Sequence, residues 1–143
     1  GMIGDSLTDA FGKSLNKSFG SLPGSTGKGA GIFTKVASAA GIDSSGPYTG
    51  ESYDAAALIV LAIQAGGSAD RGSIAKNVMA VANGPGKKIY PGQLKKALNL
   101  LAKGKAVDYE GATAVNFTDV GEAFGSFLEK EVKYGKFKTK KQR

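Results

Sequence analysis

The sequence has no cysteine, no histidine and no tryptophan among its 143 residues. Without cysteine there is no disulfide, no thiolate nucleophile and no zinc–sulfur site. Without histidine the commonest general base and metal ligand is missing. The remaining acid–base candidates are carboxylates, lysines and tyrosines, and the carboxylates are scattered. Asp108 and Glu110 are two residues apart, but their spacing and context do not indicate a catalytic pair or a metal site. We therefore predict a chain that is not an enzyme and that holds no metal or cofactor.

The sequence also lacks a long hydrophobic run. The longest apolar stretch, residues 55–63, is far shorter than the roughly 20 residues that span a bilayer. Hydrophobic residues make up 41% of the chain and charged residues 22%, which is typical of a globular protein. A chain of this length is the size of one domain and can bury a core.

Acidic residues are outnumbered, with 12 against 19 lysines and arginines, which gives a formal charge of +7. A charge of this sign raises the possibility of a nucleic-acid partner. Five of the positive charges lie in residues 136–143, which leaves +2 on the other 135 residues. The body of the chain is therefore close to neutral, and we interpret 136–143 as a short, solvated and frayed basic tail.

Hydrophobic periodicity and the positions of glycine and proline predict five helices followed by strands. The helices are expected at residues 7–17, 32–40, 53–65, 74–81 and 91–101, the last with Pro91 in its first turn. Short strands are expected at residues 19–22, 114–117, 127–132 and 136–139, the last two joined by a turn at Tyr134-Gly135.

The third helix is apolar on nearly every side, so it should be the most buried element. Ser52 is expected to cap its first turn, and Asp54 suits its positive end. Leu58, Ile59 and Leu61 are expected in the core. So many helices usually cover a sheet, and the strands here are too few to complete one. The predicted fold class is α/β, with about five helices on an incomplete sheet and a C-terminal β-hairpin.

Two motifs resemble binding sites but have simpler explanations. Residues 24–29 read Gly-Ser-Thr-Gly-Lys-Gly, yet the residue after Lys28 is glycine rather than the Ser or Thr that a phosphate-binding loop requires. In the terminal hairpin, basic residues alternate with Phe137, as in proteins that bind single-stranded nucleic acid. A hairpin with one buried face explains the same pattern, and we prefer it.

Several segments in order carry a resemblance to a known family. They are Gly4-Asp5-Ser6 before a helix, Gly46-Pro47-Tyr48 leading to Tyr53-Asp54-Ala55-Ala56, Asp108-Tyr109-Glu110-Gly111, Asn116-Phe117-Thr118-Asp119-Val120-Gly121 and Gly135-Lys136-Phe137. Together they resemble the C-terminal part of type I periplasmic solute-binding proteins of ABC transporters, in particular the branched-chain amino acid-binding subgroup.

The resemblance implies a partial type I periplasmic-binding-protein fold. Residues 1–143 would form a single C-terminal segment of a two-lobed protein, with 136–143 as its basic tail. The parent would bind an amino acid-like small molecule in the cleft between its lobes, deliver it to an ABC permease for transport, and reside in the periplasm. Carried over by position, Asp5 would pair with the ligand's ammonium group and Tyr48 would line the cleft. The fragment would expose apolar faces that the missing lobe covers, so it should form a homo-oligomer.

The leading hypothesis is thus a non-catalytic, ligand-binding segment of an ABC importer for branched-chain amino acids or related small polar solutes, with no nucleic acid as partner. The alternative is a free-standing basic α+β module that binds nucleic acid or a protein through its C-terminal hairpin and tail.

Overall fold

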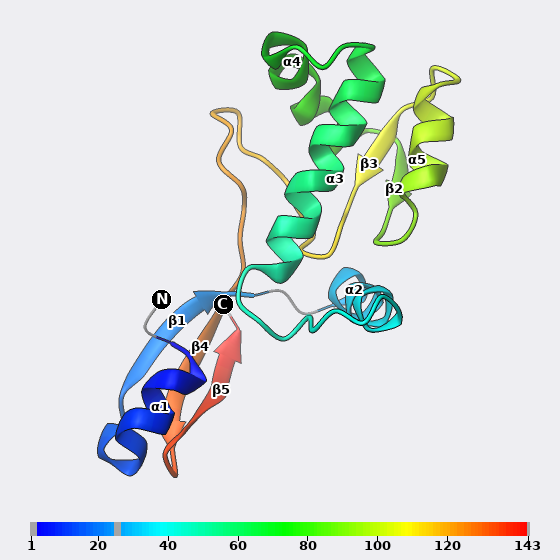
Figure 1. Ribbon diagram of the computed structural model, residues 1–143. Helices are drawn as coiled ribbons and strands as arrows, with labels where there is room; N and C mark the ends of the chain where they lie inside the picture. The colour runs from blue at the N-terminus through cyan, green and yellow to red at the C-terminus, as the bar shows by residue number, and fades with distance from the viewer. Residues whose placement is uncertain (1–2, 25–26, 143) are drawn as a thin grey trace. The chain divides into compact units, whose positions relative to one another are not determined.

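The structure is a computed structural model that describes residues 3–24 and 27–142. It is a mixed α/β arrangement with two small sheets, one of three strands and one of two (Figure 1). In chain order its elements are α1 (Asp5–Phe11), the 3-10 helix η1 (Gly12–Leu15), β1 (Phe19–Pro23), α2 (Lys28–Ala39), α3 (Thr49–Gly66), α4 (Arg71–Ala82), β2 (Lys87–Ile89), α5 (Leu94–Leu101), β3 (Val107–Tyr109), β4 (Phe127–Lys133) and β5 (Lys136–Gln142). The chain divides into two compact units, one of residues 1–24 and 126–143 and the other of residues 25–125.

The larger unit is built around α3, as predicted. In Figure 1 this helix is flanked by α4 and α5, and it packs against both. Leu58 and Leu61 are buried, and Leu61 is 0% exposed. Around them lie buried side chains of α4, β2, α5 and β3, namely Val81, Ala82, Ile89, Ala97, Val107 and Tyr109. The expectation for Ile59 was wrong: it is 47% exposed, because it lies on the side of α3 that no other element of this unit covers.

Two strands in this unit were not predicted. β2 and β3 form a two-stranded parallel sheet, with Lys87 opposite Val107 and Ile89 opposite Tyr109. Each is only three residues long, too short for period-2 alternation to stand out from the sequence. Their buried residues, Ile89, Val107 and Tyr109, contribute to the core under α3.

The start of α3 also differs from the prediction. The helix begins at Thr49, one turn earlier than expected, so Ser52 lies inside it and does not cap it. The residue before it, Tyr48, adopts a left-handed conformation with φ of 65°. The Thr49 hydroxyl donates to the carbonyls of Ser44 at 2.9 Å and Gly46 at 3.0 Å, which fixes the loop that enters the helix.

The smaller unit is a three-stranded antiparallel sheet in the order β1-β4-β5. The predicted hairpin is confirmed, and its second strand runs through Gln142, so the basic tail is paired in the sheet over the described residues rather than frayed. Val132 is buried on one face of this sheet, and α1 contacts β5. The predicted first helix is shorter than expected, ending at Phe11 and continuing as the 3-10 helix.

Two other local predictions were wrong. Residues 114–117 do not form a strand: the Asn83 side chain accepts from the Phe117 N–H at 2.9 Å and donates to its carbonyl at 2.8 Å. The Asn83 side chain thus supplies part of the hydrogen bonding of this segment, and a single antiparallel β-bridge pairs Phe117 with Ala123. Pro91 lies in a turn before α5, which begins at Leu94.

No helix among the described residues is long and apolar enough to cross a membrane. Nor do the described carboxylates include any group of three or more that could hold a metal ion. The loop at 24–29 includes Ser25 and Thr26, which lie outside the described residues.

Candidate functional site

Tyr48 borders a largely apolar hollow of about 400 Å³ in the larger unit. One wall comes from α2, and the other from the loop and first turns of α3. The lining residues are Phe33, Val36, Ala37, Ala40, Ile42, Pro47, Tyr48, Thr49, Ser52 and Tyr53. None of them is charged, so the hollow suits an apolar group rather than an ion.

Tyr53 connects the two walls of this hollow. Its ring packs against Phe33 with the ring centroids 5.2 Å apart, and its hydroxyl accepts from the Gly92 N–H at 2.9 Å. Tyr53 therefore joins α3 to the turn before α5 and has a structural role. Tyr48 is 53% exposed, and its ring is available to a ligand at the rim.

Asp5, the other predicted site residue, is the first residue of α1 in the smaller unit. Its side chain is exposed, and its backbone carbonyl accepts from the Thr8 hydroxyl at 3.0 Å. An exposed carboxylate at a helix N-terminus is stabilised there by the helix dipole. Because Asp5 and Tyr48 belong to different units, their joint action on one ligand stays a prediction.

The most strongly bonded carboxylate is Asp54, which is 2% exposed and near the start of α3. Its Oδ1 accepts from the Tyr109 hydroxyl at 2.9 Å and from the Ala112 N–H at 2.8 Å. Its Oδ2 accepts from the N–H and the hydroxyl of Thr113, each at 2.8 Å. These donors stabilise a buried carboxylate that forms no ion pair with any described residue. From the sequence, Asp54 was expected at the positive end of the helix, but its role as an acceptor for the segment after β3 was not predicted, although both segments belong to the resemblance.

Burial raises the pKa of the Tyr109 phenol, and the charge and hydrogen bond of Asp54 add to the effect. The phenol therefore stays protonated and remains a donor to the carboxylate. Gly111, between β3 and these donors, has φ of +59°, and a Cβ there would lie too close to both Asp54 carboxylate oxygens. The cluster of Asp54, Tyr109, Ala112 and Thr113 thus binds the start of α3 to the segment after β3.

Other charged groups form smaller local arrangements. The Lys88 Nζ pairs with Glu110 and lies 3.9 Å from Oδ2 of Asp108. The hydrogen bond that Lys88 donates to Glu110, followed by the charge of Glu110, raises the Lys88 pKa. Backbone and side-chain hydrogen bonds from Ser45 lower the pKa of the exposed Asp43 carboxyl. Neither arrangement lines the hollow beside Tyr48.

The terminal hairpin, on which the alternative function depends, uses many of its charges internally. Lys133 pairs with Glu131 and Lys140 with Glu129, and Lys130 donates to the Thr139 hydroxyl at 2.8 Å. Phe137 is half-buried opposite Val132. This arrangement matches a hairpin with one buried face better than a surface for stacking bases.

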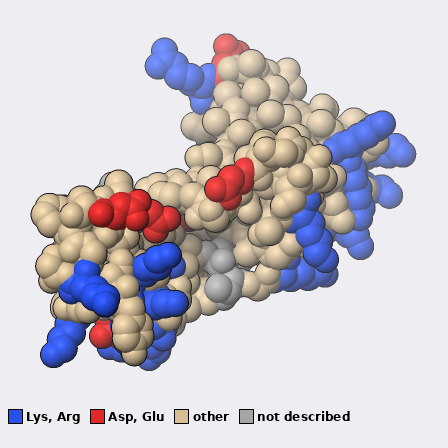
Figure 2. Space-filling model, turned by 60° about the horizontal axis from the view of Figure 1, so that its bottom comes forward, with Lys and Arg blue, Asp and Glu red and all other residues tan. Residues whose placement is uncertain are grey.

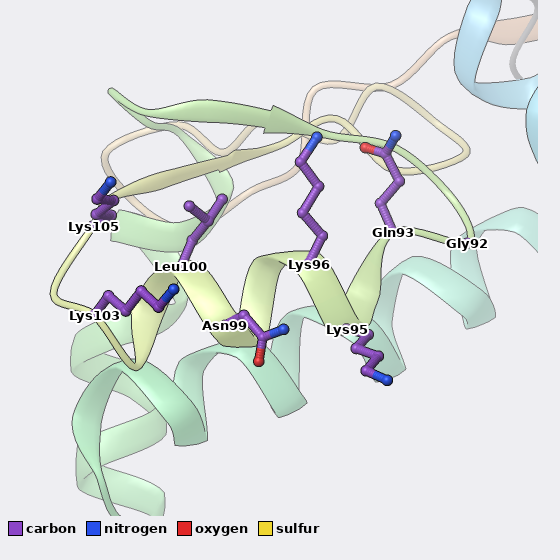
Figure 3. Close-up of a pocket in the computed structure, with 8 residues that line it drawn as sticks. All are labelled: Gly92, Gln93, Lys95, Lys96, Asn99, Leu100, Lys103 and Lys105. Carbon is purple, nitrogen blue, oxygen red and sulfur yellow. The ribbon is translucent and has the colours of Figure 1, made fainter.

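A second hollow, of about 530 Å³, lies along α5 (Figure 3). Its lining combines four lysines with two amides, one leucine and one glycine: Gly92, Gln93, Lys95, Lys96, Asn99, Leu100, Lys103 and Lys105. No carboxylate is among them. The sequence analysis did not identify this basic hollow.

Comparison with known proteins gives the class of fold and two relatives. The chain has a partial periplasmic-binding-protein-like fold: it is similar over 96% of its length to a crystal structure of a leucine-binding protein, LivK, from Thermotoga maritima, with a TM-score of 0.62 and 19% identity. It is also 35% identical over 83 residues, or 57% of the chain, to the chemotactic signal transduction system substrate-binding protein BasB of Halobacterium salinarum.

No protein-family model matches the chain. The matched regions cover 33% of the leucine-binding protein and 20% of the halobacterial protein, so the chain spans only a fraction of either relative. Both relatives are named as binding proteins rather than enzymes, and the similarity supports a solute-binding role in general.

Proposed function

We propose that this chain is part of a non-catalytic solute-binding protein that delivers branched-chain amino acids or related small polar solutes to an ABC importer. The observation that carries the proposal is the structural likeness to a leucine-binding protein over 96% of the chain. Such a protein would act outside the cytoplasm, in the periplasm or at the cell surface.

In the proposed site Asp5 binds the ligand's ammonium group and Tyr48 contacts its apolar part. The exposed carboxylate at the start of α1 is free of any intramolecular cation among the described residues. The uncharged hollow beside Tyr48 suits an aliphatic side chain. A carboxylate that meets an ammonium group in a closed cleft forms a charge-assisted hydrogen bond, which is stronger than a neutral one.

The test of these roles is calorimetry with leucine on the full-length protein from which the chain would derive. Asp5→Asn should weaken binding by about tenfold or more, since it removes a charge-assisted bond worth roughly 1.5–3 kcal/mol. Tyr48→Phe should have a much smaller effect because it keeps the ring. The control is Asp9→Asn, an equally exposed carboxylate of α1. Unchanged affinity in Asp5→Asn would remove Asp5 from the site.

The isolated chain should behave differently from that parent. Phe19, Val120, Phe124 and Tyr134 are large and exposed, and exposed apolar surface favours association. We propose that the isolated chain forms a homo-oligomer, which light scattering would detect. A clean monomer at high concentration would contradict this proposal.

A further inference from the structure

The positive charge of this chain is concentrated in a second segment besides its C-terminal tail. Residues 84–107 contain six lysines and no carboxylate. Since residues 136–143 carry five positive charges, the rest of the chain has a net charge of −4. In Figure 2, Lys and Arg side chains gather at the right, the side where α5 lies in Figure 1, with no acidic side chain among them on that face.

Four of these six lysines, Lys95, Lys96, Lys103 and Lys105, line the 530 Å³ hollow along α5. All four are exposed, and among the described residues no carboxylate lies within ion-pair distance of any of them. Lys88, in contrast, is neutralised by Glu110 and Asp108. The hollow therefore carries uncompensated positive charge.

The placement of Lys95 and Lys96 opposes the stability of α5. Lys95 and Lys96 lie in the first turn, which has no acidic residue and no side-chain cap. Cations at the positive end of a helix are unfavourable. A departure from the local rules that stabilise a helix is expected where a surface serves a function.

The floor of the hollow is less polar than its rim. The half-buried Leu100 lies between the lysines, and Gln93 and Lys96 project from the same side of the helix in Figure 3. Lysine stems add apolar surface beneath the ammonium groups. The hollow thus combines an apolar floor, two amides at Gln93 and Asn99, and a cationic rim.

We propose that the hollow along α5 is a docking site for an acidic polypeptide segment of a partner protein. Carboxylates on such a segment complement the unpaired lysines, and an apolar side chain between them can enter the hollow over Leu100. The NH₂ groups of Gln93 and Asn99 can donate to its backbone carbonyls, while Oε1 of Gln93 already accepts from the Tyr90 N–H at 3.2 Å. A flat anionic membrane would contact the lysines but leave the hollow unfilled. Bases of a nucleic acid would need exposed aromatic rings for stacking, and none lines the hollow.

The experiment measures fluorescence anisotropy of a labelled decapeptide of glutamates with one central leucine, titrated with the 143-residue chain. The test variant is Lys96→Gln/Lys103→Gln/Lys105→Gln. The control variant, Lys13→Gln/Lys35→Gln/Lys76→Gln, removes the same charge from three exposed lysines on other elements. We expect the unmodified chain to bind the peptide and its affinity to fall with rising salt. The affinity should fall about tenfold or more in the test variant and at most twofold in the control variant.

A peptide with glutamine in place of each glutamate should bind at least tenfold more weakly. Equal losses in both triple variants would show a response to net charge alone and would overturn the proposal. The proposal would also be overturned if the acidic peptide did not bind at all. The same holds if the chain bound vesicles of anionic phospholipid or single-stranded DNA more strongly than the acidic peptide. None of these results depends on whether the chain binds an amino acid.

Discussion

The Tyr109 hydroxyl donates a 2.9 Å hydrogen bond to Oδ1 of Asp54, a residue 55 positions earlier in the chain. This contact joins the end of β3 to the first turns of α3. Ala112 and Thr113 complete the hydrogen bonding of the same carboxylate. Two of the segments that resemble a solute-binding protein, one around Asp54 and one around Tyr109, therefore belong to one structural cluster.

Asp54→Asn should lower the free energy of unfolding by about 3 kcal/mol or more. One carboxylate oxygen becomes an NH₂ group facing backbone or hydroxyl donors, and hydrogen bonds to a charged group are worth roughly 1.5–3 kcal/mol each. Urea denaturation followed by circular dichroism measures the change. Asp119→Asn, an exposed carboxylate of the same unit, should stay within about 0.5 kcal/mol of the wild type. Equal stability of the two variants would show that the buried cluster contributes nothing.

Two glycines with similar positive φ angles allow the cost of backbone strain to be separated from the cost of crowding. Gly104 has φ of +68° with nothing within 4 Å of an added Cβ, whereas at Gly111 the Asp54 carboxylate occupies that space. Gly104→Ala should cost about 1–2 kcal/mol from the left-handed conformation alone. Gly111→Ala should cost about 1–3 kcal/mol more because the added methyl group displaces Asp54. Thermal unfolding of both variants tests this, and an equal loss would contradict the crowding at Gly111.

The raised pKa of Tyr109 makes stability depend on alkaline pH. Its ordinary pKa is 10.0, and the folded value lies above it. The unfolded chain therefore loses this proton first as pH rises, so the contribution to stability is complete below about pH 10 and declines above it. Tyr109→Phe should be less stable at neutral pH but should decline less steeply above pH 10. Urea midpoints from pH 8 to 11 measure this, and parallel curves for both proteins would count against it.

Leu61 reports on the central position of α3. It is 0% exposed, and truncation to alanine in a packed core costs about 2–5 kcal/mol. Ile59→Ala, two residues away on the same helix and 47% exposed, should cost about 1 kcal/mol or less. Chemical denaturation of the pair provides the comparison. A larger loss at Ile59 than at Leu61 would mean that the other face of α3 is the buried one.

The sequence predicted the helices and the terminal hairpin well because their signals are local. Periodic apolar residues identified α3 and α4, and the Tyr134-Gly135 turn identified the pair β4–β5. It did not predict β2 and β3, whose three-residue pairing depends on a contact between distant segments. The start of α3 at Thr49 was missed for a related reason, since hydrogen bonds to Ser44 and Gly46 hold the loop there.

The candidate site was predicted only in part. Tyr48 was named as a residue of a cleft between two lobes, which stays a prediction; the structure places it at the rim of a hollow within the larger unit. The neighbouring wall from α2 depends on packing between Phe33 and Tyr53, which no spacing reveals. The lysines along α5 were visible in the sequence, but the helical pattern drew attention to the leucines between them. That these lysines lack acidic partners became evident only from the structure, in which the carboxylates nearest in sequence, Asp108 and Glu110, pair with Lys88 instead.

Calorimetry with leucine tests the central claim, that this chain is one part of a solute-binding protein. The full-length protein should bind leucine or a related small polar solute with micromolar affinity or better, and the 143-residue chain should not. A micromolar site requires roughly 8 kcal/mol, whereas an exposed charge pair at Asp5 supplies about 0–1 kcal/mol. Micromolar binding of leucine by the isolated chain, or no binding of any amino acid or small polar solute by the full-length protein, would contradict the account.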